Sequence, residues 1–93
     1  MPRRTPKMTP EEALGEVIRA IRLQRGLSQE ELSFACGMHR TYISLIERGI
    51  NSPSLRTLIA IATALQAKPS QLLGCVEHSV GESHFPSRSF KCS

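Results

Sequence analysis

The segment LSQEELSFACGMHRTYISLIERG, from Leu27 to Gly49, constrains the fold more than any other part of this chain. It contains start signals for two short helices. Ser28 with Glu31 at the N3 position forms a capping box for the first of them. Gly37 then lies between the two helices, where a left-handed residue that ends a helix is favoured. Two short helices joined by a tight turn that contains glycine form a helix-turn-helix unit.

The flanking segments also predict helices. The stretch TPEE at Thr9 predicts a helix start with proline at N1, and Gly26 ends that helix. Ser54 caps a fourth helix, and KPSQLLG predicts a short fifth helix that ends at Gly74. The residues of the fourth helix expected to face the core are Leu55, Leu58, Ile59, Ile61, Ala62 and Leu65. The sequence therefore predicts an all-α fold, a compact bundle of five short helices.

Composition and motifs exclude several classes of protein. No apolar run approaches the ~20 residues of a membrane span, and prolines interrupt the N-terminus, so we expect a cytoplasmic protein. Three cysteines, Cys36, Cys75 and Cys92, imply no disulfide framework. Together with His78 and His84, the last two fit no compact zinc spacing, so no metal or other cofactor is expected. No nucleophile lies in a motif with an activating partner, and we expect no catalytic residue and no enzyme.

The second helix of the unit, residues 39–48, presents a polar outer face. At 100° per residue, Ile43 and Ile46 point toward the core. An α-helix fits the major groove of DNA, which is about 12 Å wide. Arg40 can then reach guanine O6 and N7, and Leu45 can contact a thymine methyl group. The candidate base-contacting residues are His39, Arg40, Thr41, Ser44 and Leu45.

Phosphate contacts are expected beside this face. The first turn of the preceding helix, at Ser28 and Gln29, offers backbone N–H groups and the positive end of the helix dipole. Asn51 and Ser52, in the loop after residue 48, are a second candidate site. Tyr42 can place its hydroxyl on a phosphate or can pack on the preceding helix, and the sequence leaves both readings open.

Residues 13–73 resemble the XRE/Cro-type helix-turn-helix family of phage repressors, restriction–modification controller proteins, antitoxins and small regulators. The matching stretches are LSQEELSFACGM, RTYISLIERG and NSPSLRTLIAIATAL. The resemblance implies a lambda repressor-like DNA-binding domain. In this family, the positions that correspond to Gln29, His39, Arg40, Thr41, Tyr42 and Ser44 touch DNA. The resemblance also implies contacts to the DNA backbone from Arg48, Asn51 and Ser52.

The resemblance also implies a structural ion pair between Arg22 and Glu47, and dimerisation through the fourth and fifth helices. The candidate interface residues are Leu72, Leu73 and Val76, which alternatively close the core of the monomer. The chain departs from the family at three positions. His39 replaces a Ser or Thr N-cap, Gln66 replaces a glycine, and Lys68 replaces another capping residue.

The domain prediction has three parts: a basic flexible arm at 1–8, the DNA-binding domain at 9–74 and a flexible tail at 75–93. The net charge is +4, and the arm holds three of these charges. They belong to Arg3, Arg4 and Lys7. Basic arms of this kind can enter a groove of DNA, or they can remain solvated.

These observations predict a small transcription regulator, a repressor or autoregulator, that binds double-stranded DNA sequence-specifically as a homodimer on an inverted repeat. Two alternatives remain at this point. An antitoxin would use the same DNA face and fold its tail on a toxin. A helical protein-interaction adaptor would show no preference among duplexes.

Overall fold

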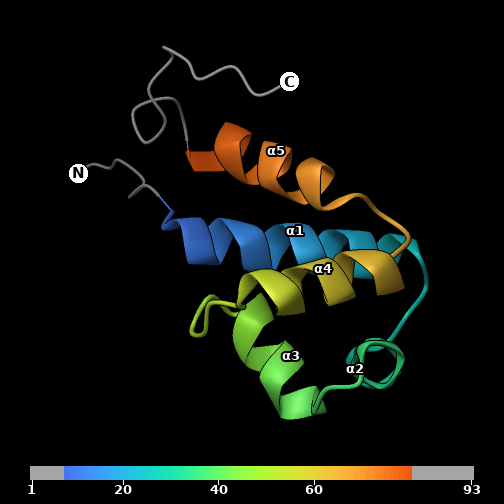
Figure 1. Ribbon diagram of the computed structural model, residues 1–93. Coiled ribbons are helices and arrows are strands. Elements are labelled where there is room, and N and C mark those ends of the chain that lie inside the picture. Colours follow the sequence, from blue (N-terminus) through green and yellow to red (C-terminus); the bar gives the residue numbers. More distant parts are fainter. Residues whose placement is uncertain (1–7, 81–93) are drawn as a thin grey trace.

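The computed structural model describes residues 8–80, and within that range the chain forms five helices and no strand. The helices are α1 (Pro10–Gln24), α2 (Gln29–Cys36), α3 (Arg40–Glu47), α4 (Leu55–Ala64) and α5 (Pro69–Val80). In Figure 1, α1 runs through the middle of the molecule with α5 along one side, and α2 and α3 form the opposite end. The predicted all-α bundle is confirmed. None of these helices is long and apolar enough to cross a membrane.

The helices begin where the sequence places their caps. The Thr9 hydroxyl accepts from the Glu12 amide at 3.0 Å, and the Glu12 carboxylate accepts from the Thr9 amide at 3.0 Å. The same reciprocal pair joins Ser28 and Glu31, at 3.0 and 2.8 Å. Gly37 follows α2 with φ of 72°, in the left-handed region that glycine adopts without steric strain. Local sequence therefore fixes where α2 starts and ends.

All five helices contribute to one apolar core. Buried leucine and isoleucine side chains each stabilise the fold by about 1.5–3 kcal/mol relative to exposure. The core residues are Ala13, Leu14, Ile18, Leu32, Ile43, Ile46, Leu58, Ile61, Ala62, Leu65, Leu72, Val76 and Val80.

The fifth helix is longer than predicted. It continues to Val80, so the expected flexible tail from residue 75 was wrong for 75–80. Gly74 does not end the helix, and Leu72, Val76 and Val80 repeat at helical spacing and are buried in the core that α1 and α5 share. Burial of this stripe outweighs the weak helix propensity of one glycine. Residues 81–93 lie outside the described range.

The other end of the domain also differs from the prediction at one residue. Met8, assigned to the flexible arm, is half-buried and packs against the core. The rest of the arm, with its three basic residues, lies outside the described range.

The fourth helix buries fewer residues than predicted. Leu55 and Ile59, expected in the core, are 71% and 45% exposed. The buried positions of this segment are 58, 61, 62 and 65, which form a single stripe at helical spacing. The two remaining apolar side chains therefore lie on the outer side of α4.

The connection from α4 to α5 contains two of the three departures from the family pattern, Gln66 and Lys68. Gln66 takes φ of 59°, the left-handed conformation in which a glycine was expected. The Arg25 guanidinium donates to the carbonyl oxygens of Leu65 at 2.8 Å and of Gln66 at 3.3 Å. At the start of α5, the Lys68 amide donates to the Gln71 side chain at 2.9 Å, which is the half of a capping box that does not need a Ser or Thr at the N-cap.

Candidate DNA interface

The inner and outer faces of α3 are sharply divided. Ile43, Ile46 and Glu47 are buried. Thr41 and Arg48 are exposed, and Ser44 and Leu45 are half-buried. These last four positions follow the i, i+3, i+4, i+7 spacing of one helix face. The core thus holds one side of α3 and leaves a short, mostly polar side at the surface, as the helical geometry predicted.

The start of α3 carries no side-chain cap. His39 is the N-cap residue, but its side chain makes no capping hydrogen bond. The first amides of a helix have no partner within the helix. His39 and Arg40 are both exposed, so their side chains and the first amides of α3 lie together at one surface. That surface offers hydrogen-bond donors to an external acceptor.

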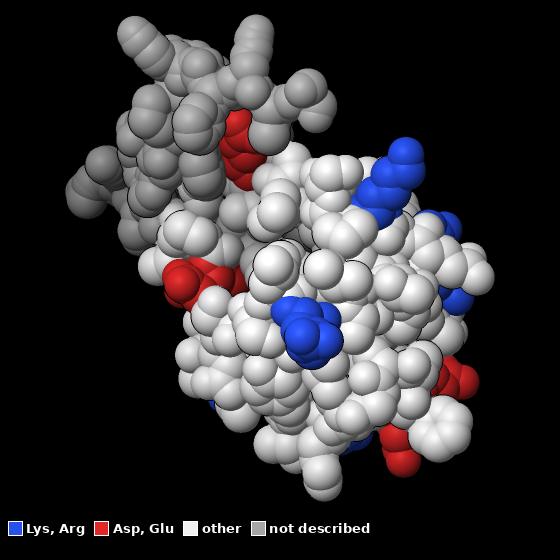
Figure 2. Space-filling view, in the orientation of Figure 1, with Lys and Arg blue, Asp and Glu red and all other residues white. Residues whose placement is uncertain are grey.

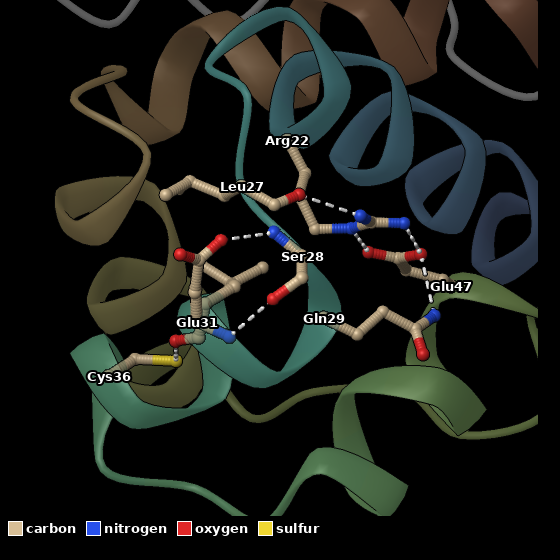
Figure 3. A network of polar contacts seen from close by, with 8 residues as sticks. Arg22, Leu27, Ser28, Gln29, Glu31, Cys36 and Glu47 are labelled. Atoms are coloured by element: carbon tan, nitrogen blue, oxygen red, sulfur yellow. Dashed lines mark hydrogen bonds and ion pairs between the residues drawn. The ribbon is translucent and has the colours of Figure 1, made fainter.

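The start of α2 is built differently. The Ser28 hydroxyl accepts from the Glu31 amide and so closes the helix end, while its own hydrogen remains available to donate. Gln29, the first residue of α2, is half-buried, and its side chain turns toward the end of α3 (Figure 3). The N-terminus of α2 and the C-terminal turn of α3 therefore meet.

A buried ion pair lies at this meeting point. Arg22 Nε donates to Glu47 Oε2 at 2.7 Å, and Arg22 Nη2 donates to Glu47 Oε1 at 3.0 Å. The two side chains are only 8% and 2% exposed. A third donor, Arg22 Nη1, reaches the Leu27 carbonyl oxygen at 2.8 Å. The predicted ion pair is confirmed, and its bidentate geometry is the stronger form of an Arg–carboxylate contact.

The side-chain amide of Gln29 joins this ion pair, which the sequence did not predict. Gln29 Nε2 donates to Glu47 Oε1 at 3.0 Å (Figure 3). An amide nitrogen carries two hydrogens, so one donor of Gln29 remains for another acceptor. No local pattern indicates this contact, because eighteen residues separate the two partners.

The remaining candidates for phosphate contact have different surroundings. Tyr42 is half-buried and packs against the core, which agrees with the packing alternative for its ring. Asn51 is half-buried, and its backbone N–H donates to the Leu45 carbonyl oxygen at 3.3 Å. Ser52 is exposed. The loop after α3 is thus tied back to α3 by its backbone.

The cysteines form no chemical site in the described part of the chain. Cys36 is half-buried against the core, and its thiol donates to the Leu32 carbonyl oxygen at 3.0 Å. Burial raises the pKa of this thiol, so it stays protonated at neutral pH. Cys75 is exposed on α5. Between residues 8 and 80 no three His, Cys, Asp or Glu side chains gather to hold a metal ion, and His84 and Cys92 lie outside that range.

A second surface lies on α4. Leu55, Arg56 and Ile59 line a shallow hollow there. Figure 2 shows the side of the molecule on which α4 lies in front. Most of the surface in this view is neither basic nor acidic, although a basic side chain lies near its middle. Sequence reasoning missed this surface because it assigned both apolar residues to the core.

The predicted dimer contacts on α5 need correction. Leu72 is 0% exposed and Val76 is 5% exposed, because both close the core of the monomer. Of these three predicted contacts, only Leu73, at 49% exposure, is available to a partner.

The model of the helix-turn-helix family matches residues 18–72, which is more than half of the chain. This protein belongs to the helix-turn-helix family. Over 60 residues it is 48% identical to the control protein C.BamHI of Bacillus amyloliquefaciens, a match that covers 63% of this chain and 74% of that protein. The resemblance seen in the sequence is therefore confirmed.

Solved structures of two other helix-turn-helix proteins have the same fold. The clp gene regulator ClgR from C. glutamicum superposes with a TM-score of 0.78 at 29% identity, covering 84% of this chain and all of ClgR. The restriction–modification controller protein C.Esp1396I, a tetramer in complex with its natural 35-base-pair operator, gives a TM-score of 0.70 at 27% identity. That match covers 80% of this chain and 97% of the controller protein. Within this fold, α2 and α3 are the two helices of the motif.

Proposed function

We propose that this helix-turn-helix protein is a small transcription regulator that binds double-stranded DNA sequence-specifically, with α3 in the major groove. The observation that carries the proposal is the uncommitted outer face of α3. It presents polar side chains at the surface while Ile43 and Ile46 anchor the helix in the core. Relatives described as a control protein, an immunity repressor and a transcriptional regulator support the same role.

Base recognition is assigned to the first turns of α3. Arg40 is exposed at the helix start, and its guanidinium suits the paired acceptors of guanine. Thr41 and Ser44 donate to base edges, and Leu45 contacts a thymine methyl group. His39, whose side chain makes no cap, adds an imidazole at the same edge.

Phosphate contacts position the domain on the duplex. The first amides of α2, those of Gln29 and Glu30 next to Ser28, face one phosphate with the positive end of the helix dipole, whereas the Ser28 amide is held by the Glu31 carboxylate. Arg48, at the end of the outer face of α3, and Ser52, in the loop that follows, are exposed. Asn51, in the same loop, is half-buried. Tyr42 contributes through its hydroxyl, since its ring packs inward. Such contacts set register and orientation rather than sequence choice.

A homodimer completes the proposal. One recognition helix reads only a few base pairs, and two copies related by two-fold symmetry would read half-sites about 34 Å apart. Leu55 and Ile59 supply an exposed apolar surface on α4, and Leu73 supplies another apolar side chain on α5. Hydrophobic residues in a solvent-exposed hollow are typical of protein interfaces. Occupation of a promoter by such a dimer would repress transcription.

The test is selection of binding sites from a random-duplex pool at two salt concentrations. We expect enrichment of an inverted repeat that is bound more weakly at high salt, because contacts to phosphate release counterions. Arg40→Ala should alter the selected sequence at one position per half-site. Lys68→Ala, which removes a cation from the loop between α4 and α5, is the matched control and should select the same repeat. Salt-sensitive binding without enrichment would contradict the proposal and favour a protein-interaction adaptor.

A further inference from the structure

We infer that Glu47 is a positioning residue for DNA binding. Held in place by Arg22, its carboxylate orients the side-chain amide of Gln29 so that the second Nε2–H of that amide faces a DNA phosphate. This inference rests on the proposed function, because it concerns how one of the phosphate contacts is prepared.

The carboxylate of Glu47 is fixed before it acts on Gln29. Both of its oxygens accept from Arg22, at 2.7 and 3.0 Å, and its side chain is 2% exposed. The oxygen nearer to α2, Oε1, then also accepts from Gln29 Nε2 at 3.0 Å. Figure 3 shows the carboxylate between the guanidinium and the amide. Gln29 is thus held by an anchor that has little freedom to move.

An oriented amide is a better phosphate ligand than a mobile one. A glutamine side chain loses rotamer freedom when it binds, and a side chain that is already ordered loses less. Nε2 has two hydrogens in fixed directions, so occupying one with Glu47 determines where the other points. A bond to the charged carboxylate is also stronger than one between neutral groups.

The same ion pair sets the position of the backbone that carries Gln29. Arg22 Nη1 donates to the carbonyl oxygen of Leu27 at 2.8 Å, and Leu27 precedes the N-cap of α2. Glu47 is the last residue of α3. One guanidinium from α1 therefore relates the phosphate site at the start of α2 to the helix that reads bases.

The alternative is that the ion pair only stabilises the fold. The two roles differ in what they predict for a variant that stays folded. The paired substitution Arg22→Met with Glu47→Leu replaces the buried charges by apolar groups, which folds tolerate well when both partners are removed. It deletes the anchor of Gln29 together with the bond from Arg22 to the Leu27 carbonyl oxygen, and it leaves the side chains on the outer face of α3 unchanged.

The experiment measures affinity for the selected inverted repeat over a range of salt concentrations, corrected for the folded fraction from thermal unfolding. We expect Gln29→Ala to weaken binding about tenfold, because a hydrogen bond to a charged group is lost. The paired variant should weaken binding by a similar factor. Combining all three substitutions should weaken it no further, because each removes the same contact. The slope of log affinity against log salt should not change, since the lost ligand is neutral.

A control variant separates stability from positioning. Leu58→Ala opens a cavity in the core at α4, which contributes no group to the ion pair, and should lower stability while the folded protein keeps its affinity. Wild-type affinity in the folded paired variant would overturn the inference, as would a triple variant in which the two losses multiply. If wild-type protein selects no repeat, the proposed function itself fails, which is a distinct result.

A measurement without substitutions keeps the test decisive if the paired variant does not fold. Relaxation of the side-chain amide nitrogens by NMR reports their motion in the unbound protein. Gln29 should be markedly more ordered than Gln24, an exposed glutamine at the end of α1. Equal mobility of the two amides would overturn the inference.

Discussion

The outer faces of α3 and α4 have opposite character, although the two helices are anchored alike. Each buries a stripe of aliphatic side chains in the same core, represented by Ile43 in α3 and Ile61 in α4. Outside, α3 is mostly polar and begins with the exposed Arg40, whereas α4 exposes Leu55 and Ile59. The buried stripe determines the fold, and the opposite stripe is left to specify the partner. A donor-rich face suits nucleic acid, and an apolar face suits a second protein surface.

The largest effect is expected from disrupting the α4 face. Leu55→Glu places a negative charge at a residue that is 71% exposed, so the monomer should fold normally. In a two-fold interface the two introduced charges would repel each other. We expect a monomer in analytical ultracentrifugation and a loss in affinity for the inverted repeat of about 100-fold, since coupling between the half-sites disappears. Affinity for an isolated half-site should not change. A dimer that persists would show that the interface lies elsewhere.

The next largest effect is expected where α3 packs on α1. A Cβ atom at Gly15 would clash with the carbonyl oxygens of Ile46 and Glu47 at the end of α3. Gly15→Ala should therefore lower the free energy of unfolding by about 1–3 kcal/mol, as overpacking does. Chemical denaturation measures this change. Gly74→Ala is the matched control, because a Cβ atom added there would meet no atom within 4 Å and alanine favours α5. Equal stability of the two variants would contradict the tight α1–α3 contact.

The α3 face is tested directly by Arg40→Ala. Its loss should weaken binding to the repeat by about 1–3 kcal/mol and relax the choice of base at one position in each half-site. The oligomeric state and the thermal stability should stay at wild-type values, in contrast to the variants above. Fluorescence anisotropy on the repeat and on single-base variants measures both quantities. Unchanged discrimination among bases would remove Arg40 from the reading face.

The smallest effect concerns the starts of the two helices. Ser54 caps α4 by accepting from the Thr57 amide at 3.1 Å, whereas His39 makes no such bond at α3. Ser54→Ala should reduce stability by about 1 kcal/mol, and His39→Ser should increase it by a similar amount. Thermal unfolding of the two variants provides the comparison. A loss of stability in His39→Ser would show that the imidazole supports the fold in another way.

The sequence predicted best those features that depend on neighbouring residues. The capping boxes at Thr9 and Ser28 and the left-handed Gly37 are local, and all three are confirmed. The outward direction of the α3 face followed from its strict helical periodicity. The Arg22–Glu47 pair came only from the family resemblance, because nothing within either helix identifies its partner.

The errors arose where tertiary packing decides. Apolar residues occur on most sides of α4 itself, so its sequence alone does not show which of Leu55, Leu58 and Ile59 faces the core. The end of α5 was misplaced because Gly74 resembles a helix terminator, while burial of Val76 and Val80 continues the helix. The hydrogen bond of Gln29 to Glu47 is likewise set by the approach of two separate helices.

The position of Arg22 limits how the DNA-reading unit can be moved between proteins. A graft that began at residue 27 would contain Glu47 but not the arginine that neutralises it. Leaving one member of a buried ion pair unpaired costs about 3–5 kcal/mol, enough to unfold many small domains. The smallest transplantable module therefore includes α1. Within that module, the base-reading positions 40, 41, 44 and 45 can be recoded for a new operator while the buried scaffold is retained.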